Sequence, residues 1–167
     1  MKFRPLSILI LLALLLSSVP FNAQDDRTPP CDDGFRQVEH TLGPLCVPQN
    51  PQRVVVLDAM ENVMSLGVQP VGASNWIGTA TGEQATFPAH LSESYLEGVE
   101  WLGDNKQPNL ELILALEPDI ILGRNNWHAE NYSQFSAIAP TFLVDRNDLG
   151  GWKGMFFAYA DALNRQA

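Results

Sequence analysis

The stretch QPNLELILALEPDIILGRNNWHAENYSQFSAIAPTFLVD, residues 107–145, predicts a helix, a strand, a polar loop, a helix and a strand in succession. Leucine and isoleucine recur at helical spacing after Pro108, and Pro118 ends that helix. The run 119–123 (DIILG) is short and apolar, as a buried parallel strand requires. The loop 124–128 (RNNWH) is expected to be exposed. It leaves the carboxyl end of that strand, which is the edge where open α/β sheets bind ligands.

The pattern continues on both sides of this loop. A second helix is expected over about 131–139, where Pro140 ends it, and 141–145 (TFLVD) supplies the next strand. Upstream, residues 99–103 (VEWLG) predict a short edge strand. Downstream, a helical pattern begins at Trp152 and is still running at the last residue of the sequence.

An earlier part of the chain repeats the alternation of strand and helix. Residues 53–58 (RVVVLD) form the strongest strand pattern in the sequence because the run is β-branched and unbroken. A short helix is expected over 59–66, with Gly67 as its C-terminal stop, and 68–74 (VQPVGAS) forms the next strand. Strand, helix and strand within so few residues predict the α/β class with a parallel, Rossmann-like sheet.

The first residues have the composition of a secretory signal. Lys2 and Arg4 precede an apolar run over 6–16, and cleavage after Ala23 fits the small residue there. An uncleaved anchor is the alternative. No cysteine directly follows the apolar run, so a lipobox is not seen. The sequence predicts export, and a periplasmic location.

Two cysteines are the whole thiol content of the chain. In an exported protein Cys31 and Cys46 are expected to pair rather than to stay free or to bind a metal. Residues 35–40 and 45–47 predict two strands with Gly43–Pro44 as the turn between them. The disulfide would then staple an N-terminal β-hairpin, with a stabilisation of about 3 kcal/mol in the loop-entropy model.

The charge is strongly acidic. The whole chain carries −9, and without Lys2 and Arg4 the balance is 8 basic against 19 acidic residues, or −11. This balance argues against nucleic acid and against anionic lipid surfaces as partners.

No enzyme motif is recognisable. The sequence contains neither a dinucleotide-binding nor a phosphate-binding glycine pattern, and no nucleophile elbow. The histidines His40, His90 and His128 are scattered and have no metal-ligand spacing. The sequence therefore favours binding over catalysis.

Polar and aromatic residues do gather where the predicted strands end. They are Met60, Glu61, Asn75, Trp76, Asn105, Lys106, Arg124 through His128, Asp145 and Arg146. Trp76 and Trp127 could simply cover the edge of the core, and His128 could cap the following helix. Together, however, aromatic, cationic and amide groups at one sheet edge suit a bulky, oxygen-rich anionic ligand.

At this point the chain resembles a known family. The order VPQNPQRVVVLD, SLGVQPVGAS, WLGDNKQPNLELILALEPDIIL and FSAIAPTFLVD resembles the N-terminal lobe of periplasmic ferric-siderophore-binding proteins. These are the solute receptors of ABC iron importers. The segments VEHTLG and HAENY fit the ferric citrate and ferric hydroxamate branch. The resemblance covers roughly residues 36–160.

The resemblance implies two α/β lobes joined by one long helix, with the ligand in the cleft between them. It also implies that a glutamate in the P-N-L-E motif, here Glu111, docks onto the membrane permease. Relatives often place an arginine two residues after the glycine that corresponds to Gly103. Here that position is Asn105, with Lys106 beside it, which leaves the charge and headgroup of the ligand open.

From this resemblance we expect a receptor that captures a ferric siderophore and passes it to an ABC permease. Fe(III) would be held by the chelator's own oxygens, so no cofactor binds the protein directly. The expected ligand contacts are Trp76, Asn105, Lys106, Arg124, Asn126, Trp127 and His128. Cobalamin, haem or a bare metal are alternative ligands. A half-receptor without ligand affinity of its own, dependent on a separate C-terminal lobe, is the alternative from another class.

The expected domain organisation follows. Residues 1–23 form the signal peptide, 24–34 a flexible segment, 35–150 the ligand-binding lobe and 151–167 the start of the inter-lobe helix. The C-terminal lobe of the family would be absent from the sequence.

Overall fold

A computed structural model describes residues 30–75 and 93–166. The predicted signal peptide, most of the predicted flexible segment and the candidate ligand contact Trp76 lie outside these residues. None of the helices within the described ranges is long and apolar enough to cross a membrane.

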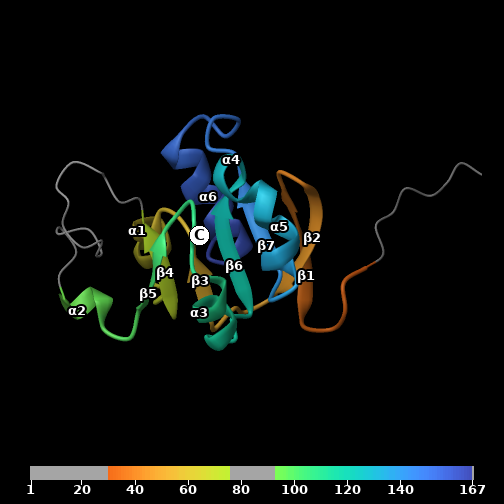
Figure 1. The fold of residues 1–167 in the computed structure, drawn as a ribbon. Coiled ribbons are helices and arrows are strands. Elements are labelled where there is room, and N and C mark those ends of the chain that lie inside the picture. Colours follow the sequence, from red (N-terminus) through yellow and green to blue (C-terminus); the bar gives the residue numbers. More distant parts are fainter. Residues whose placement is uncertain (1–29, 76–92, 167) are drawn as a thin grey trace, which may run out of the picture.

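The centre of the described fold is a five-stranded parallel sheet in the order β5-β4-β3-β6-β7. Its strands are β3 (Val54–Val56), β4 (Gly72–Asn75), β5 (Glu100–Asp104), β6 (Ile120–Arg124) and β7 (Thr141–Val144). Figure 1 shows β5 at one end of the sheet and β7 at the other. This is the order of a doubly wound α/β fold, so the predicted fold class is confirmed.

Helices cover both faces of the sheet. They are α1 (Met60–Ser65), α3 (Leu110–Ala115), α5 (Tyr132–Ser136) and α6 (Trp152–Ala162), with the short α2 (Glu93–Leu96) ahead of β5. Val54 and Val56 face a core shared with α1 and α6, whereas Val55 faces a core shared with α3 and α5. The alternation of strand side chains explains why an unbroken β-branched run was needed at the centre.

Two helix ends follow from local sequence. Asn109 caps α3, because its Oδ1 accepts the backbone N–H groups of Glu111 and Leu112 at 3.0 and 3.1 Å. Gly67 has a φ of 73° after α1, and the N–H groups of Gly67 and Val68 donate to the last turn in a Schellman motif. The predicted stop at Gly67 is confirmed.

The N-terminal hairpin is formed by β1 (Phe35–His40) and β2 (Gly43–Pro48), as predicted. The turn was predicted wrongly: Gly43 and Pro44 pair within β2, and Thr41 and Leu42 make the turn. Pro44 stands opposite Glu39 in a ribbon of only two strands. Proline is tolerated in such an edge strand, because a backbone N–H that faces outward has no neighbouring strand to donate to.

The tip of the hairpin docks on the edge strand β7, as Figure 1 shows. The backbone N–H of Thr41 donates to the Leu143 carbonyl at 3.0 Å, and the Leu143 N–H donates to His40 Nδ1 at 3.2 Å. The His40 ring also lies against Phe142 and Tyr132. Strand β7 is therefore paired with β6 on one side and held by the hairpin on the other.

The Cys31–Cys46 disulfide is present, which confirms the predicted pairing. The bond closes a segment with a sequence separation of 15 residues. We expect the Cys31→Ser/Cys46→Ser double variant to lose about 3 kcal/mol of unfolding free energy, because the unfolded hairpin regains the entropy of an open loop. Urea unfolding of the oxidised wild type, the reduced wild type and the double variant measures this loss. Equal stability of all three would contradict it.

His40 makes stability depend on pH. Burial lowers the pKa of His40, while the charge of Glu39 opposes the shift. A histidine whose folded-state pKa is lowered contributes stability that is present above its unfolded pKa of about 6.5 and is lost as the pH falls below that value. We expect stability to decline as the pH falls from about 6.5 to about 5.5, and the stability of His40→Asn to decline less.

Asparagine is the matched change because its Oδ1 can accept the Leu143 N–H without titrating. Thermal unfolding at several pH values compares the two proteins. His128 and Asp58, whose pKa values are also shifted, are common to both proteins, so the difference reports on His40. Parallel pH profiles would show that His40 does not carry the effect.

Two further boundaries differ from the prediction. The segment expected to be an exposed loop at 124–128 contains the single-turn helix α4 (Asn125–His128), followed by the 3-10 turn η1 (Ala129–Asn131). One turn is too short to show a helical period in sequence. Helix α6 was expected to run on to the last residue, but it ends at Ala162, where Asn164 takes a left-handed φ of 54°.

Candidate functional site

The candidate site lies where the direction of winding reverses, between the neighbouring strands β3 and β6. From β3 the chain proceeds outward to β4 and β5, and it then returns to β6 on the other side of β3. The loops that leave β3 and β6 therefore diverge at their carboxyl ends. Such a switch point is the usual ligand position in doubly wound sheets.

An ion pair spans this switch point. Asp58 follows β3 and Arg124 ends β6, and an Asp58 Oδ2 to Arg124 Nη1 distance of 3.6 Å joins them, with both side chains 12% exposed. Asn105 follows β5 and donates its Nδ2 hydrogen to Asp58 Oδ1 at 3.1 Å. Burial raises the pKa of Asp58, and the charge of Arg124 and the Asn105 hydrogen bond limit that rise.

The backbone turns sharply beside Asp58. Ala59 has a left-handed φ of 58°, which is uncommon for a residue with a side chain and starts α1 directly after the carboxylate. On the other side the Tyr159 hydroxyl of α6 donates to the Asp58 carbonyl at 3.4 Å. Tyr159 is fully buried, and this burial raises its pKa well above the ordinary value. Both the carboxylate and the backbone of Asp58 are therefore held in place.

His128 connects the loops after β5 and β6. Its Nδ1 accepts the Arg124 backbone N–H at 2.9 Å, so Nε2 carries the proton and donates to the Asn105 carbonyl. The side chain is 1% exposed, and burial lowers its pKa, which favours this neutral form. His128 thus fixes the backbone positions from which Asn105 and Arg124 project.

The accessible part of the site is a cluster of two cations and an indole. The Arg124 guanidinium lies 3.9 Å from the centre of the Trp127 ring, and Lys106 Nζ lies 5.7 Å from it. Lys106 is exposed and Trp127 is half-buried. Distances below about 6 Å are those of cation–π pairs.

Two cavities open beside Trp127 among the described residues. The larger, about 530 Å³, is lined by Lys106, Asn125, Asn126, Trp127, Ala129 and Glu130. The smaller, about 290 Å³, is lined by Asp58, Ala59, Glu61, Asn62, Arg124, Trp127, Arg146, Trp152 and Met155. Residues from α1, α4 and α6 therefore surround the ion pair.

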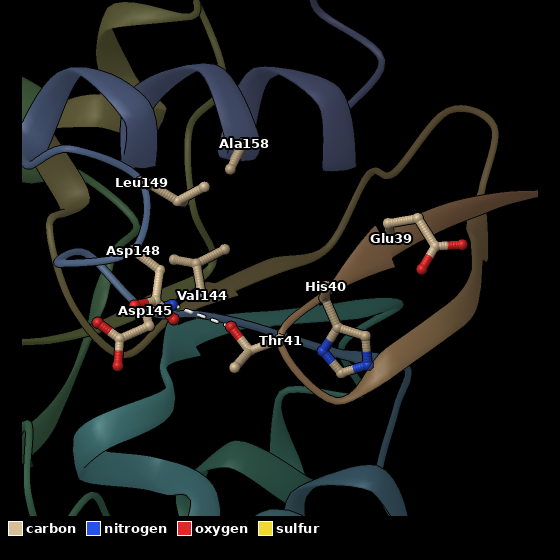
Figure 2. A pocket seen from close by; sticks show the side chains of 8 residues that line it. All are labelled: Glu39, His40, Thr41, Val144, Asp145, Asp148, Leu149 and Ala158. Carbon is tan, nitrogen blue, oxygen red and sulfur yellow. Dashed lines mark hydrogen bonds between the residues drawn. The ribbon is translucent and has the colours of Figure 1, made fainter.

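A third cavity of about 320 Å³ lies away from the switch point, between the hairpin tip, β7 and α6. Figure 2 shows Val144, Leu149 and Ala158 in its lining, together with the acidic residue Asp148. Its polar rim is already used in part, since the Asp145 N–H donates to Thr41 Oγ1 at 3.0 Å. The ligand is not assigned to this cavity, because the described residues that line it include neither lysine nor arginine.

The structure brings most predicted ligand residues together but gives them different positions. Lys106, Arg124, Asn126 and Trp127 line the two cavities. Asn105 and His128 lie beneath them, 0% and 1% exposed. Both side chains are bonded to their neighbours, Asn105 to Asp58 and His128 to the Asn105 carbonyl, and their contact with a ligand stays a prediction.

Two further acidic residues, Glu111 and Asp58, differ in how the sequence predicted them. Glu111 is exposed in the first turn of α3, and the N-cap residue Asn109 donates its backbone N–H to the Leu102 carbonyl in the middle of β5. Asp58 was not predicted as a site residue. The signal that could have found it is its position, an acid directly after the strongest strand pattern in the chain.

Comparison with known proteins identifies the family of the chain. The family model described as periplasmic binding protein matches residues 66–167, which is more than half of the chain. The chain belongs to the periplasmic binding protein family. This family consists of substrate-binding proteins.

Three similar proteins have names or titles that refer to iron chelates or siderophores. The probable siderophore-binding lipoprotein YfiY of Bacillus subtilis is 30% identical over 96% of this chain and 48% of its own length. The Fe(3+)-citrate-binding protein YfmC of the same organism is 30% identical over 96% and 50%. The crystal structure of Staphylococcus aureus SirA with staphyloferrin B superposes with a TM-score of 0.63 at 30% identity, covering 77% of this chain and 42% of that one.

The chain spans about half the length of the curated relatives that it matches. The resemblance to siderophore-binding proteins and the predicted α/β fold are confirmed by these relatives.

Proposed function

We propose that this chain is the ligand-binding lobe of an extracytoplasmic receptor that captures a ferric siderophore and delivers it to an ABC permease. The observation that carries the proposal is the cluster of Arg124, Lys106 and Trp127 beside two cavities at the switch point of the sheet. Guanidinium and ammonium groups bind oxygen-rich anions, and an indole face packs on a flat chelator.

Each accessible residue has a distinct role in this proposal. Arg124 and Lys106 attract the negative charge of the chelate, Trp127 supplies its apolar face, and the Asn126 amide offers both donors and acceptors. Asn105 and His128 keep these groups in position from below. Iron is cargo here: the chelator's oxygens hold Fe(III), and the protein contacts the chelator.

A second lobe and a permease are the proposed partners. The two cavities are open to one side of the lobe, and high affinity for a small ligand usually needs most of its surface to be enclosed. A second α/β lobe would supply the facing wall, with residues 151–167 leading toward it. Glu111 is the proposed contact with the permease, since it is exposed and stands in the P-N-L-E motif that the family resemblance assigns to docking.

The test is a fluorescence titration of the full chain with ferric citrate, a panel of ferric siderophores and cobalamin. Bound ferric chelates quench nearby indoles, so we expect saturable quenching by at least one ferric chelate. Trp127→Phe should lower that quenching, and Trp152, which lines the smaller cavity, accounts for quenching that remains. Trp101→Phe is the matched control, because Trp101 lies near the start of β5, several residues from the site edge.

The outcomes separate the alternatives. Saturable quenching by cobalamin alone would contradict a ferric siderophore as the ligand and would identify cobalamin as the ligand class. No saturable response from a chain with a cooperative unfolding transition would contradict autonomous binding. In that case co-purification with a separate second lobe becomes the measurement, because a half-receptor would bind only when both walls of the cleft are present.

A further inference from the structure

Asp58 is a carboxylate placed inside a site built to attract anions. It lines the same cavity as Arg124 and Trp127 and takes part in the ion pair that spans the switch point. Its two oxygens are directed to different partners, Oδ2 to Arg124 and Oδ1 to Asn105. The carboxylate therefore has a fixed position relative to any ligand that reaches the guanidinium.

Stability alone is a poor reason for this carboxylate. Removing two charges from water costs about as much as their attraction returns, and well-packed apolar side chains are often as good or better. The pair also leaves the Arg124 Nε and the Asn105 Oδ1 buried without a hydrogen-bond partner among the described residues. A role in binding explains the position better than a role in folding.

We propose that Asp58 is a specificity-determining residue that, by pairing with Arg124, limits how much negative charge the site accepts from its ligand. The inference rests on the proposed function and adds to it the charge class of the ligand. A site in which Asp58 offsets Arg124 retains Lys106 and Arg146 as its cations, with Glu61 and Glu130 also on the cavity walls. Such a balanced site favours chelates of low net charge, or chelates that carry a cationic group beside their anionic one.

The effect on binding follows from Coulomb's law. A charge on the ligand within several ångströms of the cavity wall interacts with Asp58 at the intermediate dielectric of a partly buried site. Removing the Asp58 charge should therefore change the ratio of affinities for an anionic and a cationic ligand of the same shape by roughly tenfold. A loss of folding or packing would lower both affinities and leave their ratio unchanged.

The experiment uses three chelates with one iron–hydroxamate core: ferrioxamine B, whose end group is a cationic amine, its neutral N-acetyl derivative and its anionic N-succinyl derivative. Ferric citrate is added as an anionic chelate of another type. Dissociation constants are measured by tryptophan quenching for the full chain and for Asp58→Asn. Asparagine keeps the shape and can still accept the Asn105 hydrogen bond. We expect the variant to shift roughly tenfold toward the anionic member of the series.

A control variant assigns the effect to the pair. Glu61→Gln removes the same formal charge from the same cavity, and we expect a smaller shift because Asp58 is the carboxylate paired with Arg124. Equal shifts for Glu61→Gln and Asp58→Asn would overturn the assignment.

The failures of the two proposals differ. If the wild type binds neither these four chelates nor any other member of the ferric siderophore panel, the proposed function falls and this inference falls with it. If the wild type binds and Asp58→Asn leaves the charge preference unchanged, only the inference is overturned.

Discussion

Replacing Arg124 by alanine is expected to abolish saturable chelate quenching and to lower the free energy of unfolding by about 3 kcal/mol. Binding is lost because the guanidinium both lines the cavity and packs 3.9 Å from the Trp127 ring centre. Stability is lost because the Asp58 carboxylate, whose side chain is 12% exposed, remains without its counterion. This expected loss of unfolding free energy lies at the lower end of the range for broken buried ion pairs, because some solvent reaches both groups.

A double variant separates these two effects. Arg124→Ala combined with Asp58→Asn removes the stranded charge, so urea unfolding should recover a large part of the lost stability while ligand quenching stays absent. Lys106→Ala is the control at an exposed position, where the stability change should stay within about 0.5 kcal/mol. An Arg124→Ala protein as stable as the wild type would mean that the pair is not energetically coupled.

Gly123→Ala should be the other strongly damaging change, with a loss of about 2–3 kcal/mol. A Cβ at this position would lie 2.8 Å from His128 Nδ1 and 3.0 Å from Leu143 Cδ2. The imidazole cannot move aside without breaking its bonds to the Arg124 N–H and the Asn105 carbonyl. The backbone that presents Arg124 would therefore shift, and chelate binding should weaken together with stability.

Gly72→Ala is the matched control for this prediction. Gly72 also lies in a buried strand, but an added Cβ there meets the flexible ends of Leu116 and Leu102. Those ends can rotate away, so the expected cost is below about 1.5 kcal/mol. Urea unfolding of both variants measures the difference. A larger loss for Gly72→Ala would show that His128 is not the rigid element.

Much of the fold could be predicted because the residues that end its helices and form its central strand act locally. Proline at 118 and 140 and Gly67 end helices, and the β-branched run that forms β3 needs no distant information to be recognised. Single-turn elements could not be predicted in this way. Helix α4 has four residues, fewer than are needed for an apolar stripe to repeat.

The candidate site was predicted less completely than the fold. Sequence placed Lys106, Arg124 and Trp127 at one edge, because the carboxyl ends of parallel strands share an edge. It could not show that β3 and β6 are neighbours, and therefore it missed the Asp58–Arg124 pair. It also could not distinguish a surface histidine from His128, whose burial depends on how the loops after β5 and β6 meet.

The docking of the hairpin on β7 has a consequence for the order of folding. His40 and Leu143 are separated by 103 residues, so the entropy of closing that loop places their contact late. Until then the free edge of β7 can pair with a strand of another molecule. The disulfide joins residues that are close in sequence, so it can fix the hairpin before β7 has formed. The hairpin is then ready to cover the edge of β7 as soon as that strand appears. Oxidation early in folding would therefore protect the chain against aggregation as well as stabilise its native state.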